Sequence, residues 1–251
     1  MPSSAPPPIA LVDVESIPAP ASPAATSDAA SHGWTLGAVA EELAGALRER
    51  DEKVAVSEVT SGGVLAASLL SLPGASSFFT GGVVAYSPGA REALTPGCDE
   101  ALKALEARRG ASNYADPTAY RRSRVAWALA AARDLQLMCG ADWGIAEVGA
   151  AGPSFHPESG HDSGVTYVAV VGPPRKRRAD EGDDEEDPED SEDAARDRVW
   201  VRRFETGHAR REENMWQFAA AAASMCARCM TDENGLDDAR RLGVDLEGRV
   251  G

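Results

Sequence analysis

The sequence predicts a single α/β domain, a three-layer α/β/α sandwich built around a mixed sheet. The chain has 251 residues, of which 43% are hydrophobic, and this is enough for one sizeable buried core. Segments with helical spacing alternate with short β-branched runs, as expected for a sheet covered by helices on both faces. The last two β-branched runs follow one another without a helix between them, so they predict a hairpin and a sheet that is not wholly parallel.

The predicted elements follow the order α-β-α-β-α-α-β-β-β-α. Apolar residues at helical spacing from Leu36 to Leu47 indicate the first helix. Pro73-Gly74 is expected to end the second helix, and Gly140 the fourth. Helices are expected near 35–50, 62–72, 99–109, 117–140 and 209–230, and strands near 53–59, 80–87, from about 143, and at 164–172 and 198–206.

Three segments are expected to lie outside the packed domain, which spans 33–230. Residues 1–32 are rich in Pro, Ala and Ser and are expected to form a disordered tail, and 231–251 form a polar C-terminal tail. The hairpin loop 175–198 holds 6 basic and 12 acidic side chains, so it is expected to be a disordered, solvated insertion. Its "RKRR" start leaves a nuclear import signal or a nucleic-acid patch as alternatives.

The charge of the chain bears on its partners. A net charge of −15 argues against nucleic acid or an anionic membrane as a partner, because their phosphates would be repelled. No apolar stretch reaches the ~20 residues that span a bilayer, and the N-terminus lacks the basic start of a secretory signal. These features predict a cytoplasmic protein.

The four cysteines do not form a disulfide or zinc pattern. Cys226 and Cys229 make a CxxC, but this lies in an alanine-rich helical run with no second CxxC or paired histidines. We therefore expect helix-face cysteines, no metal site and a reducing compartment.

One stretch, "VAVSEVTSGGVLAASLL" at 54–70, predicts a strand that passes through a tight turn into a helix. Such turns often present a nucleophile, and the hydroxyls of Ser57, Thr60 and Ser61 lie just ahead of Gly62-Gly63. Val59, at the centre of the turn, carries no hydroxyl.

With these elements placed, the sequence resembles the CinA C-terminal family over roughly 35–230. The resemblance is carried by "SEVTSGG", by "LPGASSFFTGGVVAYS", by "VGAAGP" at 148–153 and by "GVTYVAV", with an ending, "ETG…REENMWQFAAAA", like that of one branch of the family. It implies a nicotinamide-nucleotide amidohydrolase, in which a turn serine attacks the carboxamide of nicotinamide mononucleotide and releases ammonia. It also implies that helix-terminal N–H groups hold an oxyanion or phosphate, that a lysine or tyrosine assists proton transfer, and that no cofactor is needed.

This sequence departs from the family at the reacting positions. The family's serine falls on Val59, its cysteine on Thr60 and its threonine on Ser61. A second family threonine falls on Val148, and the family lysine on Arg91, whereas Tyr86 is kept. Together these changes remove the nucleophile, its hydroxyl partner and a titratable base while keeping shape and charge.

The resemblance and these departures lead to three hypotheses about function. The preferred one is a ligand-binding or regulatory pseudoenzyme that still holds a nucleotide-like small molecule such as nicotinamide mononucleotide. The first alternative is an active amidohydrolase that uses Thr60 or Ser61 as nucleophile, with Tyr86 assisting. The second is a partner-binding scaffold, and association into a homo-oligomer stays open. The expected ligand-binding residues are Glu58, Gly62, Gly63, Arg91, Gly149 and Gly152, with backbone capping as an equal alternative for Glu58.

Other polar residues are expected to have structural roles. His156 and His161 are interpreted as exposed loop histidines, with a compensating acid/base role as the alternative. His208 is interpreted as a structural residue near a helix start. Asn214, with the nearby Trp216 and Phe218, is expected to pack the last helix, and a ligand contact is the alternative for Asn214.

Overall fold

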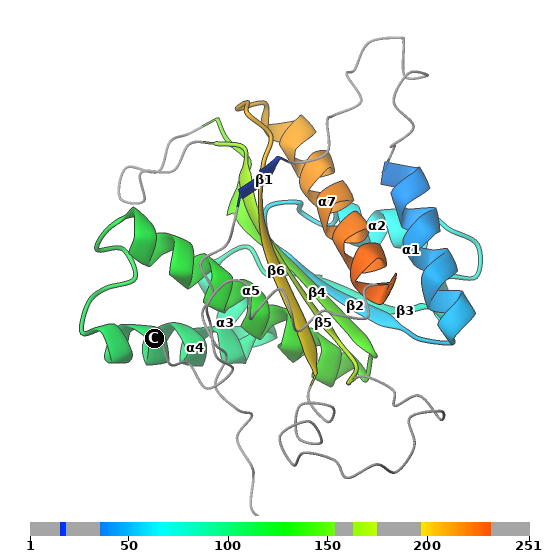
Figure 1. Cartoon of the computed structure of the whole chain (residues 1–251), viewed down its shortest axis with the longest axis horizontal. Helices are drawn as coiled ribbons and strands as arrows, with labels where there is room; N and C mark the ends of the chain where they lie inside the picture. Colours follow the sequence, from blue (N-terminus) through cyan, green and yellow to red (C-terminus); the bar gives the residue numbers. More distant parts are fainter. Residues whose placement is uncertain (1–15, 19–35, 154–162, 175–196, 232–251) are drawn as a thin grey trace, which may run out of the picture.

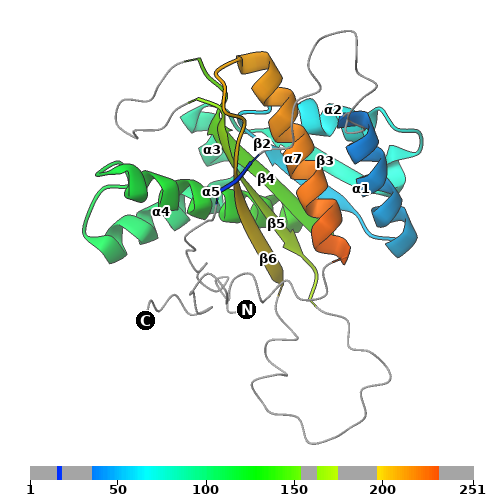
Figure 2. The same ribbon diagram turned by 45° about the horizontal axis from the view of Figure 1, so that its top comes forward.

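A six-stranded mixed sheet runs through the computed structural model between two layers of helices (Figures 1 and 2). The structure describes residues 16–18, 36–153, 163–174 and 197–231. Within them the strand order is β1-β6-β5-β4-β2-β3. The strands are β1 (Ser16–Pro18), β2 (Val54–Glu58), β3 (Phe79–Val84), β4 (Trp143–Ala150), β5 (Val165–Gly172) and β6 (Arg198–Glu205). The predicted α/β fold is confirmed.

The sheet is mixed, as the sequence predicts. β2 pairs in parallel with β3 and β4, whereas β5 pairs antiparallel with both β4 and β6. The predicted hairpin of the last two long strands is therefore confirmed. β5 is rich in valine and buried along its whole length, which suits a strand covered on both faces, whereas β6 mixes apolar residues with three arginines and a glutamate.

One strand corrects an expectation. Ser16–Pro18 lies in the segment 1–32, for which composition predicts disorder, yet it forms β1 and pairs in parallel with Arg203–Glu205 of β6. An edge strand leaves a row of unpaired backbone groups, and a second segment can satisfy them whatever its own composition. The rest of 1–32 lies outside the described residues.

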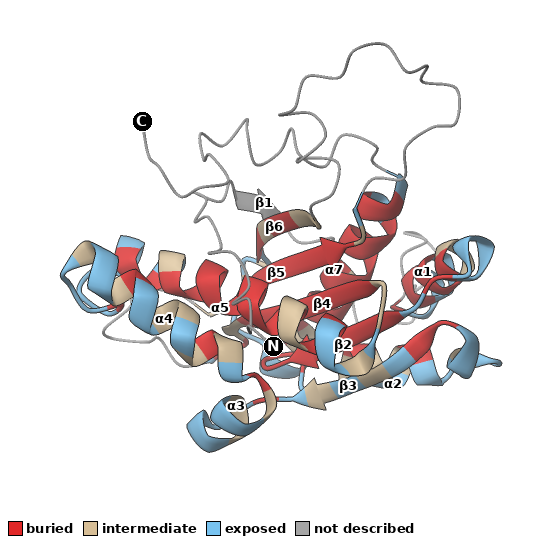
Figure 3. Cartoon of the chain, turned by 90° about the horizontal axis from the view of Figure 1, so that it is seen from below, coloured by how far each residue is buried: buried red, intermediate tan, exposed pale blue. Residues whose placement is uncertain are grey.

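Each face of the sheet is covered by its own set of helices. On one face lie α1 (Leu36–Arg50), α2 (Val64–Leu70) and α7 (Arg211–Thr231), and on the other lies α5 (Pro117–Cys139), with α4 (Pro96–Arg109) packed against its outer side (Figure 1). A 3-10 turn, η1 (Ala75–Ser77), precedes β3. Figure 3 shows the buried sheet between helices whose outer faces are exposed. This arrangement confirms the predicted layers.

A short helix between β3 and α4 was not predicted. This helix, α3 (Pro88–Leu94), begins at Ser87, whose Oγ accepts a hydrogen bond from the Ala90 N–H at 3.1 Å. Serine at the N-cap followed by proline at the first helical position is a standard helix start. The Pro88-Gly89 pair also signals a turn, and seven residues show too little periodicity to decide between the two.

The topology brings several segments to one edge of the sheet. β2, β3, β4 and β6 run in the same direction, so their carboxyl ends meet there. α2 and α7 begin at this edge because each follows one of those strands. α5 begins there too, because it ends just before β4 starts at the opposite edge. Ligands of open α/β sheets commonly bind at such an edge.

Several sequence-based expectations concern residues outside the described ranges. They include His156, His161, the "RKRR" run and nearly all of the charged loop 175–198 and the C-terminal tail. In the part of the chain that is described, no helix is both long and apolar enough to cross a bilayer.

Candidate functional site

The turn between β2 and α2 lies at the carboxyl edge of the sheet, as the sequence predicts. It spans residues 59–63, and Gly62 and Gly63 have φ angles of 69° and 96°. Residues with a side chain rarely adopt these left-handed angles. The backbone of the turn therefore requires the glycine pair, whether or not a ligand binds there.

Two fully buried glutamates hold this turn. Glu58 ends β2 and pairs in register with Glu147 of β4. Glu58 accepts hydrogen bonds from the N–H groups of Gly63, Leu65 and Ala66 at 2.8–3.0 Å, so it caps the first turn of α2. A carboxylate at a helix N-terminus satisfies otherwise unpaired donors and interacts favourably with the helix dipole. Of the two roles considered for Glu58, the structure shows the backbone cap.

Glu147 binds the other side of the turn. Its Oε2 accepts hydrogen bonds from the N–H groups of Thr60 and Ser61 at 2.9 and 2.8 Å, and its Oε1 accepts one from Thr166 Oγ1 at 2.5 Å. The family resemblance assigns the N–H groups at this helix start to an oxyanion or phosphate. In this chain, five of them donate instead to the protein's own carboxyl groups.

The hydroxyls of the turn are also engaged. Ser61 Oγ lies 2.7 Å from Glu58 Oε2 and 2.9 Å from Glu147 Oε2, and Ser61 is fully buried. Thr60, which is 5% exposed, accepts a hydrogen bond on Oγ1 from the Gly149 N–H at 2.6 Å. Both hydroxyls thus tie the turn to its surroundings, so neither is presented to solvent as a nucleophile.

The carboxyl group of Glu147 has an altered acidity. Burial raises its pKa, and the nearby Glu58 charge adds to the rise, while hydrogen bonds from Thr166 and Ser61 oppose it. The ordinary value is 4.5. Between that pH and the higher pKa of the folded state, the folded carboxyl keeps a proton that the unfolded one loses. The stability that Glu147 contributes is therefore present below pH 4.5 and is lost as the pH rises through the folded pKa.

Replacing Glu147 with glutamine is expected to remove this loss. The amide oxygen can accept from Thr60 and Ser61 N–H, and the amide nitrogen can donate to Thr166 Oγ1, as a protonated carboxyl would. Urea unfolding at pH 5 and at pH 8 should show the variant gaining stability relative to the native chain as the pH rises. If the two proteins keep a constant difference across this range, the raised pKa of Glu147 is not correct.

Val59 and Val148 lie together on the α5 face of the sheet. Both belong to one buried apolar cluster that includes Ala85 and Val125, and they are 8% and 2% exposed. At the two positions where the resemblance calls for hydroxyls, the structure therefore has buried apolar side chains. Neither valine carries an atom that can attack or donate.

Arginine and tyrosine residues lie near this apolar cluster on β5, β6 and α5. Tyr167 of β5 pairs in register with both Val148 and Arg203. Tyr120, near the start of α5, lies under the Arg124 guanidinium, 4.9 Å from the ring centroid. Burial raises the pKa of the Tyr120 hydroxyl, and the charges of Arg124 and Arg91 oppose the rise. Of these residues, only Arg91 is predicted from the sequence as a site residue.

Tyr86 and Gly152 lie on the other side of the turn. Arg211, at the start of α7, donates from Nη2 to Tyr86 Oη at 3.4 Å and from Nη1 to the Gly152 carbonyl at 2.9 Å. Tyr86 is 60% exposed. The structure thus separates the expected site residues into a group with Val59 on the α5 face and a group with Tyr86 on the α7 face. Arg211, which joins the second group, was missed because the contact spans 125 positions in the sequence.

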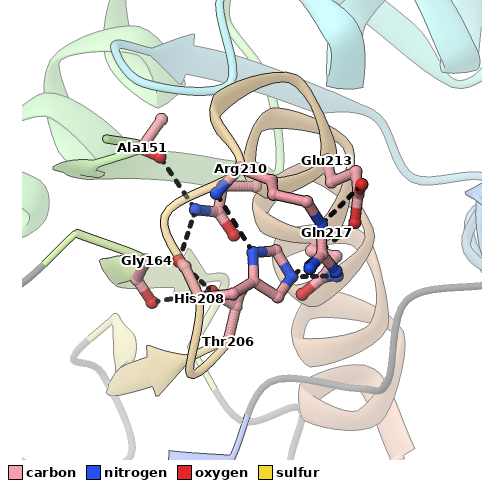
Figure 4. A network of polar contacts seen from close by, with 8 residues as sticks. Ala151, Gly164, Thr206, His208, Arg210, Glu213 and Gln217 are labelled. Carbon is pink, nitrogen blue, oxygen red and sulfur yellow. Dashed lines mark hydrogen bonds and ion pairs between the residues drawn. The ribbon is translucent and has the colours of Figure 1, made fainter. Parts of the chain in front are cut away.

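A polar network fixes the connection from β6 to α7 (Figure 4). Asn214 donates from Nδ2 to the carbonyls of Ala151 and His208 at 2.8 and 2.9 Å. His208 contacts the Arg210 N–H through Nδ1 at 3.4 Å and the Gln217 side-chain amide through Nε2 at 3.3 Å. These contacts give His208 and Asn214 the structural roles that the sequence predicts.

A metal site finds no support in the described ranges: no group of three or more His, Cys, Asp or Glu side chains there could hold an ion. Cys226 is fully buried, and this burial raises its thiol pKa well above the ordinary value. Such a thiol is unreactive and suits a helix interior.

Comparison with known sequences identifies what the chain resembles. The sequence profile described as the CinA C-terminal domain matches residues 37–189. A CinA-like protein of Frankia casuarinae is 37% identical over 129 residues, which cover 51% of this chain and 26% of that protein. A CinA-like protein of Synechococcus is 33% identical over 166 residues, or 65% of this chain and 33% of that protein. The match thus spans about a quarter to a third of the length of these relatives.

Solved structures share the fold. The crystal structure of competence damage-inducible protein A from Klebsiella pneumoniae has a TM-score of 0.57 at 19% identity, covering 78% of this chain and 98% of that one. A competence or damage-inducible protein from Enterobacter asburiae has a TM-score of 0.54 at 18% identity, covering 77% and 98% of the two chains. At such identities the likeness concerns the fold alone.

Proposed function

The chain belongs to the CinA C-terminal domain family, and from this we propose that it binds a nicotinamide-nucleotide-type ligand without hydrolysing its carboxamide. The observation that carries the proposal is the buried apolar cluster that contains Val59 and Val148. The family's reaction needs hydroxyls at these positions, and valine offers neither a nucleophile nor a proton donor.

The surrounding groups do not compensate for the missing hydroxyls. Ser61 and Thr60 are committed to the two glutamates and to Gly149. Arg91 stands at the position of the family's lysine, and a guanidinium is not suited to the role of a general base. Attack requires reacting atoms ~3–3.5 Å apart in the right alignment, and no free hydroxyl of the turn provides that.

Ligand binding is supported by what the site keeps. Arginine charges lie close to Tyr120 and to Tyr167, which belongs to the apolar cluster, although the chain as a whole has a net charge of −15. An apolar wall beside localised positive charge suits a small molecule with an aromatic ring and an anionic group. Nicotinamide mononucleotide has both.

The proposal is tested by titrating the native protein with nicotinamide mononucleotide in a calorimeter and then analysing the recovered nucleotide. We expect saturable binding and an intact carboxamide. The triple variant Val59→Ser, Val148→Thr, Arg91→Lys restores the family's groups and should produce the deamidated acid. A matched triple alanine variant at the same positions should produce none. Absence of binding to the native chain would refute the proposal, and so would deamidation by it.

A further inference from the structure

Arg124 is a buried cation with no anionic partner among the residues that the structure describes. It lies in the second turn of α5 and is 6% exposed. Within the described ranges it donates a hydrogen bond from Nε to Ser123 Oγ at 3.3 Å and stacks over the Tyr120 ring. Among the described residues, no carboxylate lies within 4.0 Å of its guanidinium. Further along the same helix, Arg133 forms an ion pair with Asp197 at 3.1 Å. Helix α5 therefore carries one arginine that is paired with a carboxylate and one that has no such partner in the described part of the chain.

The surroundings of Arg124 add positive charge. Arg91 of α3 acts on the Tyr120 hydroxyl together with Arg124, and Arg121 acts on the Tyr167 hydroxyl. Arg121 is exposed and Arg91 partly exposed, so the positive charge extends from the buried guanidinium to the surface. An entering anion would be attracted along this path.

A buried charge without a counter-charge lowers the stability of the folded protein. A hydroxyl and an aromatic ring offset only part of the desolvation of a guanidinium. An anion that binds the guanidinium in its planar, two-pronged geometry offsets far more, and phosphate has the matching shape.

Arg124 lies on the helix that packs over the cluster of Val59 and Val148. Val125, the next residue, belongs to the same cluster as Val59 and Val148. Tyr167, which interacts electrostatically with Tyr120, pairs in register with Val148. The guanidinium and the two valines therefore lie on the same face, at the same edge of the sheet.

We propose that Arg124 is the anion-binding residue of this site and that it holds the phosphate group of a mononucleotide, with Arg91 adding charge beside it. The proposal rests on the proposed function for the identity of the nucleotide. It places the phosphate at Arg124 and not at the N–H groups of the turn. In this chain those N–H groups donate to Glu58 and Glu147.

The test compares Arg124→Met with the control Arg133→Met, using three probes: nicotinamide mononucleotide, nicotinamide riboside, which lacks the phosphate, and inorganic phosphate. Arg124→Met should weaken binding of the mononucleotide by about 30-fold, the size of a lost charge-assisted contact. It should leave binding of the riboside unchanged and abolish thermal stabilisation by phosphate. Without ligand, its Tm should equal or exceed that of the native chain, because an unpaired buried charge is gone. Arg133→Met should change none of the binding results.

The outcomes separate the two proposals. If Arg124→Met binds the mononucleotide as tightly as the native chain, the role of Arg124 is refuted and the proposed function stands. If phosphate stabilises the native chain through Arg124 but the mononucleotide does not bind, the anion site stands and the proposed function fails. A lower Tm of ligand-free Arg124→Met, with phosphate stabilisation intact, would show that Arg124 serves only to pack against Tyr120.

Discussion

Replacing Glu58 with glutamine is expected to lower the free energy of unfolding by about 3 kcal/mol. Both carboxylate oxygens of Glu58 only accept: they receive the N–H groups of Gly63, Leu65 and Ala66 and face the Ser61 hydroxyl. An amide would turn an NH2 group toward at least one of these buried donors and would also remove the negative charge from the start of α2. Urea unfolding at pH 7 measures the loss.

Glu147→Gln is the matched control for this prediction. It changes the same atoms in a neighbouring buried glutamate, but one of its oxygens faces Thr166 Oγ1, which can accept as well as donate. We expect the Glu147 variant to lose much less stability than the Glu58 variant at pH 7. If the two variants lost equal stability, capping of α2 by Glu58 would not make a special contribution to the stability of the fold.

Replacing Gly149 with alanine is also expected to cost about 3 kcal/mol, at the upper end of the usual range for overpacking. A Cβ at this position would lie 2.2 Å from the Val165 carbonyl oxygen and 2.6 Å from the Thr166 Cα. These are backbone atoms of the paired strand, so they cannot move aside as a flexible side chain could. The same chemical denaturation experiment measures the effect.

Gly45→Ala provides the control for that substitution. Gly45 lies inside α1, and a Cβ there would meet nothing within 4 Å. Alanine should therefore stabilise the helix by about 0.5–1 kcal/mol. If Gly149→Ala were tolerated as well as Gly45→Ala, the close approach of β4 and β5 could not be the reason for a glycine at 149, and a ligand-binding role for it would gain support.

Most of the fold follows from local patterns in the sequence. The strands β5 and β6 and the helices α1 and α5 lie within a few residues of their predicted limits. Their periodicity is clear, and glycine or proline lies at or near an end of β5, β6 and α5. β1 is not predicted from the sequence because it forms only by pairing with the edge of β6. Ser16 pairs with Arg203, which lies 187 positions further along the chain. Pairing over such a distance leaves no local signal.

The site could be predicted only in part. The turn, Val59 and Val148 follow from spacing within motifs, but the contacts of Glu147 with Thr60 and Ser61 span 87 and 86 positions. A glutamate inside the apolar run "WGIAEVGA" was the available signal, because a buried carboxyl group requires partners. Arg124 offers a similar indication, because it is an arginine on the buried, mainly apolar side of α5 near the start of the helix.

The most direct test of the central claim is release of ammonia from nicotinamide mononucleotide by the native protein, compared with Thr60→Ala and Ser61→Ala. The valines at 59 and 148 and the engaged hydroxyls predict no release above the uncatalysed background for any of the three proteins, under conditions where the native chain binds the nucleotide. Release by the native chain that disappears in either alanine variant would contradict this account and would identify the hydroxyl that attacks the carboxamide.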